Sequence, residues 1–189
     1  MSCLKELNLQ LQNNVEDLKY PIGKYLVQPF SEKLWKTWLN DIKFLPQHLE
    51  NAILDLDEAQ LQTPYREGGW TVHQLVHHVA DSHMNAYIRF KLGLTEENPT
   101  IKPYNEAAWA KMIDTEKLPV NLSLTILHAV HARWHLILEN MNEEDLLRTV
   151  YHPEYMKEYT LWDLLGLYSW HSKHHVAHIT NLRERMGWG

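Results

Sequence analysis

The sequence predicts an all-α protein: a four-helix bundle with an N-terminal extended arm and a long connection between helices 2 and 3. Four long segments carry apolar residues at helical spacing, and no segment is rich in alternating strand-forming residues. A hydrophobic content of 44% and a charged content of 22% are typical of a folded globular chain. The long connection, residues 95–121, excludes four helices joined only by tight turns.

The length of 189 residues fits one domain, which we expect to span residues 1–189. Neither an internal repeat nor a low-complexity linker divides it. Residues 1–30 are expected to form the arm, because Pro21 and Pro29 disfavour a helix there.

The first long helix is predicted to open at Ser31. Pro46 lacks a backbone N–H, so it should break or restart this helix, and the apolar pattern then resumes as far as Leu56. Residues 63–69 contain a proline and two glycines and are expected to form a loop.

The later helices carry clearer start signals. Thr71 and Gln74 have the spacing of a capping box, and the second helix should follow them and end at about Leu94. The third helix fits residues 122–141, and residues 148–159 suggest a small hairpin or loop. The fourth helix should begin with a second capping box at 160–163 and stop at Gly187.

Composition and charge limit the function classes. The net charge is -6 with histidine neutral, and no block of basic residues stands out, which argues against nucleic acid as a partner. The one cysteine, Cys3, makes an intrachain disulfide impossible and fits a reducing compartment. No signal-peptide core and no run of about 18 apolar residues is present, so we expect a cytoplasmic protein that does not enter a membrane.

Histidine is unusually abundant and clustered. The chain has 13 histidines, and most of them lie in residues 73–83, 128–135 and 171–178. On the fourth helix three of these histidines lie on one stripe that begins and ends in leucine. The stripe consists of Leu164, Tyr168, His171, His175, His178 and Leu182. His171 and His175 are four residues apart, so their rings can reach one cation.

A third ligand must then come from another helix. The second helix offers His73, His77, His78 and His83, and spacing leaves His78 and His83 as alternatives at the two sides of its apolar face. The pair His131/His135 on the third helix is a competing site, but no equally histidine-rich stripe accompanies it. Otherwise those residues should be solvated or should support the ligands.

Three stretches of the chain resemble the DinB superfamily, and within it the YfiT branch of metal-dependent hydrolases, which is related to bacillithiol S-transferases. The resemblance rests on Tyr65-Arg66-Glu67-Gly68-Gly69-Trp70-Thr71, on His77-His78-Val79-Ala80-Asp81-Ser82-His83-Met84-Asn85 and on Trp170-His171-Ser172-Lys173-His174-His175-Val176-Ala177-His178-Ile179. It implies that His78, His171 and His175 are the metal ligands. It further implies a helix bundle, one zinc or nickel ion per subunit and a homodimer.

Three histidine ligands leave an open coordination position, which is typical of catalytic sites. Two reactions on a small-molecule substrate fit: hydrolysis by an activated water, and transfer of a low-molecular-weight thiol to an electrophile. Hydrolysis calls for a general base, for which His83, His178 and Asp81 are candidates, although Asp81 is equally suited to anchor a ligand imidazole. A non-catalytic metal-binding protein is the third alternative.

Overall fold

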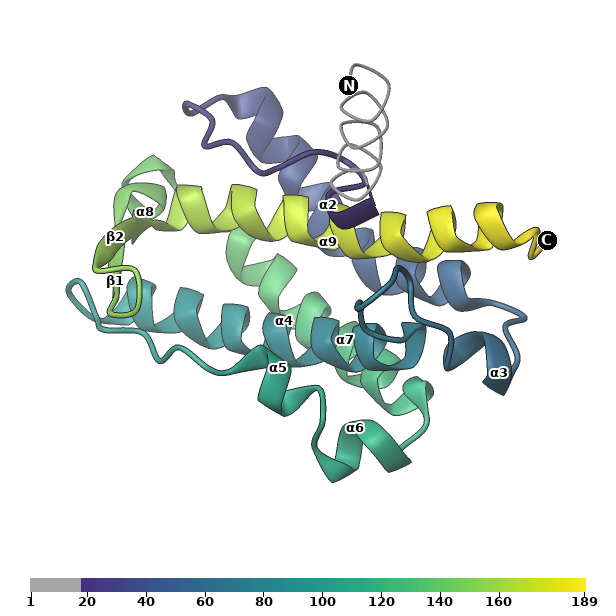
Figure 1. The fold of residues 1–189 in the computed structure, drawn as a ribbon. Helices are drawn as coiled ribbons and strands as arrows, with labels where there is room; N and C mark the ends of the chain where they lie inside the picture. Colours follow the sequence, from purple (N-terminus) through teal and green to yellow (C-terminus); the bar gives the residue numbers. More distant parts are fainter. Residues whose placement is uncertain (1–17) are drawn as a thin grey trace, which may run out of the picture.

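The computed structural model describes residues 18–189, and within them it confirms the predicted four-helix bundle (Figure 1). The long helices are α2 (Glu32–Ile53), α4 (Val72–Thr95), α7 (Val120–Glu139) and α9 (Leu161–Met186). The connections contain four short helices and one hairpin: α3 (Glu58–Leu61), α5 (Glu106–Trp109), α6 (Ile113–Lys117), α8 (Glu143–Leu147), β1 (Thr149–His152) and β2 (Lys157–Thr160).

The order of helices around the bundle does not follow their order in the chain. Helix α2 packs mainly against α7 and α9, and α4 packs against the same two helices. Consecutive long helices α2 and α4 therefore lie diagonally across the bundle, as do α7 and α9. Figure 1 shows α9 crossing the molecule, with the hairpin near its beginning and the C-terminus at its end.

The predicted helix starts are confirmed in their hydrogen bonds. The Ser31 side chain accepts from the backbone of α2, and Thr71 forms a capping box with Gln74 at the start of α4. Thr160 and Asp163 form the same reciprocal pair before α9. Each cap satisfies backbone N–H groups that have no partner inside the helix.

Two boundaries differ from the prediction. Helix α2 continues through Pro46 without a restart. It ends at Ile53 rather than Leu56 because Leu54 leaves the helical conformation, with ψ of 135°, and Asp55 then adopts a left-handed backbone with φ of 62°. The third long helix begins and ends two residues earlier than the predicted 122–141. The apolar pattern extended past the true end of α2 because Leu56 still packs on the core.

Of the two alternatives for residues 148–159, a hairpin or a loop, the structure shows the hairpin, an antiparallel pair in which Thr149 faces Thr160. Arg148 ties it to the end of α4: its Nε donates to the Gly93 carbonyl at 2.6 Å and its Nη2 to the Glu96 carbonyl at 2.9 Å. These bonds satisfy carbonyls that the helix end leaves without a partner.

The described part of the predicted arm runs along α9. The Trp162 and Trp170 indole nitrogens donate to the arm carbonyls of Gln28 and Gly23 at 2.8 and 3.0 Å. The Tyr25 hydroxyl donates to the Asp163 carbonyl at 3.3 Å. The rest of the arm, residues 1–17 with Cys3, lies outside the described residues.

A layer of histidines divides the core. Buried apolar side chains form one group near the hairpin, with Ile42, Phe90, Trp134 and Leu164, and a second group towards the other end, with Leu49, Leu75, Leu127 and Leu182. On α4, α7 and α9, His83, His131, His171 and His175 fall in the sequence between residues of the two groups. The candidate site therefore lies where the apolar core is interrupted.

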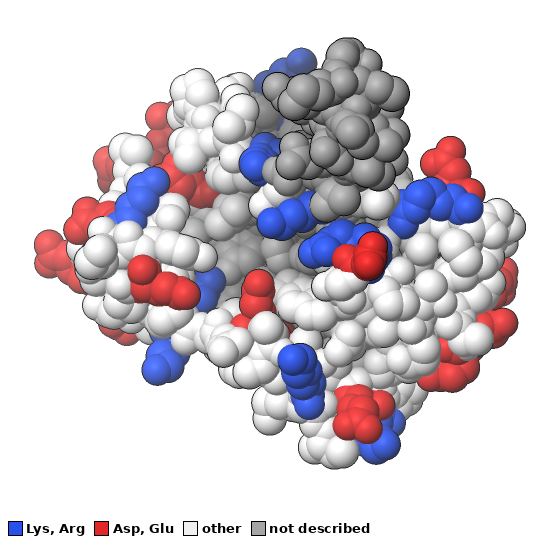
Figure 2. All heavy atoms as spheres, in the orientation of Figure 1, with Lys and Arg blue, Asp and Glu red and all other residues white. Residues whose placement is uncertain are grey.

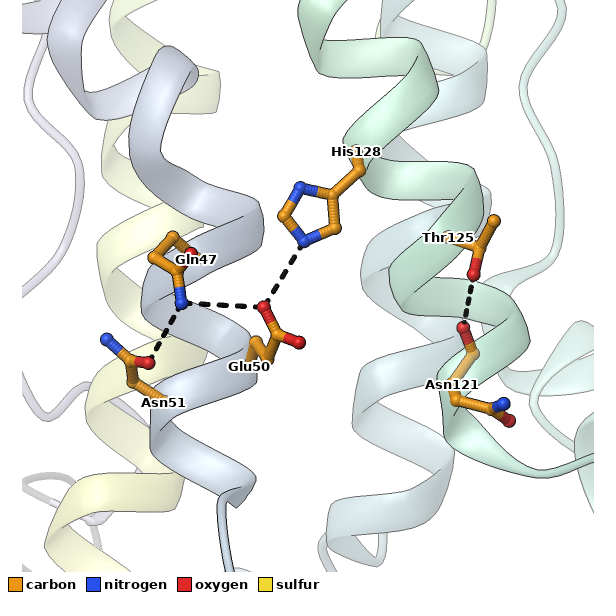
Figure 3. A network of polar contacts seen from close by, with 6 residues as sticks. All are labelled: Gln47, Glu50, Asn51, Asn121, Thr125 and His128. Carbon is orange, nitrogen blue, oxygen red and sulfur yellow. Dashed lines mark hydrogen bonds and ion pairs between the residues drawn. The ribbon is translucent and has the colours of Figure 1, made fainter.

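Charged side chains of both signs are interspersed on the face drawn in Figure 2. At the surface between α2 and α7, His128 Nε2 approaches the Glu50 carboxylate at 3.4 Å, and Gln47 bridges Glu50 and Asn51 (Figure 3). No helix within residues 18–189 has the length and apolar character that crossing a membrane requires.

Candidate metal centre

Three histidines from two helices converge beside the layer of histidines. His78 comes from α4, and His171 and His175 come from successive turns of α9; one ring nitrogen of each lies within 4.8 Å of the others. The Nε2 atoms of His171 and His175 are 3.0 Å apart. The structure thus brings together the three residues that the resemblance implied, and it places His78 rather than His83 beside both rings.

Burial keeps these imidazoles neutral. Desolvation is the largest cause that lowers the pKa of His78 to about 4, with a further contribution from His174. Desolvation and neighbouring histidines hold the pKa of His171 and of His175 well below the ordinary value. Neutral imidazoles have the free nitrogen lone pair that a metal ion requires.

The donor set fits a divalent cation. Nitrogen ligands bind zinc at about 2.0–2.1 Å, so two of them on one ion stand roughly 3 to 3.5 Å apart, as the His171 and His175 Nε2 atoms nearly do. We find no mismatch between these residues and such an ion.

Two cavities meet at the triad. The histidine cavity, of about 380 Å³, is lined by the three histidines together with Tyr65, Arg66, Trp70, Glu106, His174 and His178. The hairpin cavity, of about 910 Å³, lies between α4, α9 and the hairpin, where the surface in Figure 2 is hollowed. His171 and Glu106 line both cavities, so a molecule in either one lies beside the triad.

The three candidate bases lie in different places. His178 lines the histidine cavity, packs against the Tyr65 ring with centroids 4.0 Å apart, and has its Nε2 3.0 Å from that of His174. His83 is fully buried and lines neither cavity; its Nε2 lies 3.1 Å from His171 Nδ1. The Asp81 carboxylate forms no hydrogen bond with His78, His171 or His175, and burial raises its pKa to about 6.

The other clustered histidines have separate partners. The Nε2 atoms of His73 and His77 lie 3.1 and 3.0 Å from the Leu118 carbonyl, so they hold the end of the long connection against α4. In the competing pair, His131 is buried against His83, whereas His135 faces Glu139 at 3.4 Å. His131 and His135 therefore do not share a site.

Sequence reasoning missed Glu106 and Arg89. Glu106 lies in the 95–121 connection, and no spacing signal relates it to the histidines; desolvation and the nearby Glu154 raise its pKa. Arg89 lines the hairpin cavity, where its Nη1 donates to the Tyr168 hydroxyl at 2.8 Å. Its position seven residues after Ser82 on α4 is the signal that could have found it, because that spacing repeats one helix face.

Residues 42–179 match the model of the DinB superfamily, and this range includes all three converging histidines. The chain belongs to the DinB superfamily.

Similar proteins agree with this assignment. A Bacillus cereus (strain 03BB102) protein named "putative metal-dependent hydrolase" is 54% identical over 175 residues, covering 92% of this chain and 100% of that protein. A relative from Bacillus thuringiensis subsp. konkukian with the same description has the same identity and coverage. The solved structure of YfiT from Bacillus subtilis, described as a probable metal-dependent hydrolase with an unusual four-helix bundle topology, has a TM-score of 0.89 and 46% sequence identity over 92% of this chain and 99% of YfiT.

The buried histidines predict acid sensitivity of the metal-free protein. Desolvation lowers the pKa of His131 to about 4 and that of His178 to about 3, whereas an unfolded histidine titrates near 6.5. Between these values the unfolded chain binds protons that the folded chain does not, so the free energy of unfolding falls as pH falls from about 6.5 to 4. Each such histidine contributes up to about 1.4 kcal/mol per pH unit.

Urea unfolding at pH 7, 6 and 5, with a chelator present, measures this slope. The His131→Phe variant lacks one of the contributing groups, so its slope should be shallower. A free energy of unfolding that does not change over this pH range would contradict the prediction.

Proposed function

We propose that this DinB-superfamily protein is a metal-dependent hydrolase of a small-molecule substrate, with one zinc or nickel ion bound by His78, His171 and His175. The convergence of three neutral imidazoles within 4.8 Å, at the wall of an accessible cavity, carries the proposal. The relatives' descriptions as metal-dependent hydrolases support it. We extend the proposal to a single domain over residues 1–189, a homodimer and a cytoplasmic location, all of which were expected from the sequence or the resemblance.

The chain's own residues would orient the substrate and move the proton. A divalent ion bound by the triad supplies Lewis acidity and lowers the pKa of a coordinated water or thiol. Glu106 lines the histidine cavity and is the group placed to accept a proton there, whereas a pKa lowered to about 3 makes the His178 imidazole too weak a base. The raised pKa of Glu106 suits a general base that works near neutral pH. Arg89 and Tyr104 line the adjoining cavity and are placed to orient polar parts of a substrate.

The hairpin cavity favours a second candidate, a low-molecular-weight-thiol S-transferase. At about 910 Å³ it has room for a second molecule, and His171 and Glu106 join it to the histidine cavity. The chain's one cysteine, Cys3, lies outside the described residues, so the proposed thiol would be a cosubstrate. In this reaction the thiol gives its proton to the Glu106 carboxylate and its sulfur bonds to the electrophilic carbon, while the bond from that carbon to the leaving group breaks and the leaving group takes the electron pair.

Product formation from activated esters and electrophiles distinguishes these functions. It is measured with the metal-free and the metal-reloaded protein, each with and without an added thiol. A hydrolase should release product only when the ion is present and without thiol. Replacing Glu106 by glutamine should then lower the rate about 100-fold or more while leaving metal binding intact. Turnover that requires thiol supports the transferase instead.

Cobalt substitution gives a second readout of the same choice. A thiol that binds the cobalt-loaded protein as thiolate adds a sulfur charge-transfer band, which water and hydroxide do not. If a fully loaded sample shows neither turnover nor a response to thiols, both enzyme proposals are wrong and the non-catalytic alternative replaces them.

A further inference from the structure

Pro46 leaves one carbonyl of α2 without its helical donor. In a regular helix the N–H of residue 46 would donate to the carbonyl of Ile42, but proline has no N–H. That carbonyl lies in the core, and it is instead 2.5 Å from Nδ1 of His131 on α7. The buried acceptor created by the proline is therefore satisfied by a histidine side chain from a neighbouring helix.

From His131 a line of hydrogen bonds leads to the proposed metal site. His131 Nε2 lies 2.9 Å from His83 Nδ1, and His83 Nε2 lies 3.1 Å from His171 Nδ1. His131 and His83 are 1% and 0% exposed, so no water competes for these nitrogens. Helices α7, α4 and α9 thus contribute one imidazole each to a continuous series of hydrogen bonds.

The Ile42 carbonyl, at the end of this series of histidines, determines the donor and the acceptor of every hydrogen bond in it. A carbonyl can only accept, so His131 must carry its proton on Nδ1. In a neutral ring Nε2 is then a bare acceptor, and it takes the proton that His83 donates from Nδ1. His83 carries its proton on Nδ1, so its Nε2 is also a bare acceptor, and it takes the hydrogen bond that His171 donates from Nδ1. His171 is left with an unprotonated Nε2, which faces His175 Nε2 at 3.0 Å.

We propose that His131 and His83 are positioning residues that, anchored on the Ile42 carbonyl freed by Pro46, hold His171 in the Nδ1–H tautomer with its Nε2 lone pair directed at the metal. This inference rests on the proposed metal site and explains how one of its ligands is prepared. A metal-bound histidine commonly donates its other ring N–H to a neighbouring acceptor, which fixes its tautomer and orientation. Here the acceptor is a second histidine, which is itself held by a third.

The chain of histidines does not suit proton transfer to solvent. It ends on a backbone carbonyl inside the bundle, which cannot take up or release a proton near neutral pH. The rings are also fixed from the side, because the Trp134 ring packs edge-on against both His83 and His131, with centroids 5.8 and 5.7 Å away. Orientation of His171 is the role that this geometry supports.

Nitrogen-15 NMR of the metal-free protein tests the tautomers without any variant and without activity. Long-range correlations should show protonated Nδ1 and bare Nε2 for His131, His83 and His171. Protonated Nε2 at His83 or His131 would overturn the proposal, whether or not the protein proves to be a hydrolase.

Metal affinity measured by chelator competition tests the consequence. The His131→Phe variant keeps an aromatic ring but removes both hydrogen bonds, and it should bind the ion about 10- to 100-fold more weakly. His77→Phe is the matched control, because His77 is also buried and bonded to a backbone carbonyl but forms no hydrogen bond to the triad. Equal affinities in the two variants would overturn the proposal.

Pro46→Ala separates orientation from packing. Alanine restores an N–H that competes with His131 for the Ile42 carbonyl, while it removes a helix-breaking residue from α2. We expect an unchanged or higher unfolding midpoint together with mixed His131 tautomers and weaker metal binding. A merely structural role for the histidines predicts unchanged metal affinity and tautomers, and that result would contradict the proposal even if the His131 variant failed to fold.

Discussion

Replacement of His175 by alanine is expected to abolish stoichiometric binding of a divalent metal ion while the protein stays helical. His175 supplies one of three converging nitrogens and lies one turn of α9 from His171. Removing even a neighbour of a ligand weakens metal binding about 10- to 100-fold, so loss of a ligand should cost at least about 100-fold. The fold should survive, because His175 lies in the sequence between two separate apolar groups, which keep their packing.

Elemental analysis after dialysis against excess metal, together with circular dichroism, measures both parts of this result. His174→Ala is the matched control, since His174 is the adjacent buried histidine on α9 and its ring hydrogen bond is to His178 rather than to a member of the triad. It should retain one ion per chain. Full occupancy in the His175 variant would show that the ligand assignment is wrong.

Replacement of Trp134 by alanine is expected to lower the free energy of unfolding by about 3–5 kcal/mol. The Trp134 side chain is fully buried in the apolar group near the hairpin. It packs edge-on against Phe90 and Tyr168, with ring centroids 5.3 and 5.6 Å away, as well as against the buried histidines. Its removal leaves a large cavity in the bundle, which the surrounding helices fill only in part.

Urea unfolding of the metal-free protein at pH 7 measures this loss. Trp134→Phe should cost less, because it keeps a ring and removes an indole N–H that has no partner among the described residues. Leu136→Ala is the control on the same helix: Leu136 is 61% exposed, so its loss should change the free energy of unfolding by no more than about 0.5 kcal/mol. Equal losses for the two alanine variants would contradict the assigned packing.

Helix positions could be predicted well from sequence because their signals are local. The capping residues at 71–74 and 160–163 lie within one turn of the N–H groups that they satisfy, so their spacing alone reveals them. The end of α2 could not be predicted, because it depends on the backbone conformation of Leu54 and Asp55 rather than on the apolar pattern, which continues to Leu56.

The histidine positions were only partly predictable. Helical spacing placed His171 and His175 on one face of the last helix, but it left His78 and His83 as alternatives for the third ligand. The two residues differ in their surroundings. His78 lies beside the rings of His171 and His175, with centroids 5.5 and 5.0 Å away, whereas His83 lies against Nδ1 of His171, the nitrogen that does not face His175. Family resemblance favoured His78, and only the packing of α4 on α9 gave a geometric reason.

The sequence by itself determined the helical class, the helix starts and the existence of a histidine-rich face, because each depends on residues within a few turns of one another. The tertiary structure alone decided which groups meet across the bundle. It brings Glu106, from a connection without a spacing signal, into the wall of the cavity that the triad lines, and it sets His131 against the carbonyl that Pro46 leaves free. These contacts depend on the diagonal placement of consecutive helices, which brings α2 against α7 and α9. The hydrophobic spacing within a single helix does not identify which helices it packs against.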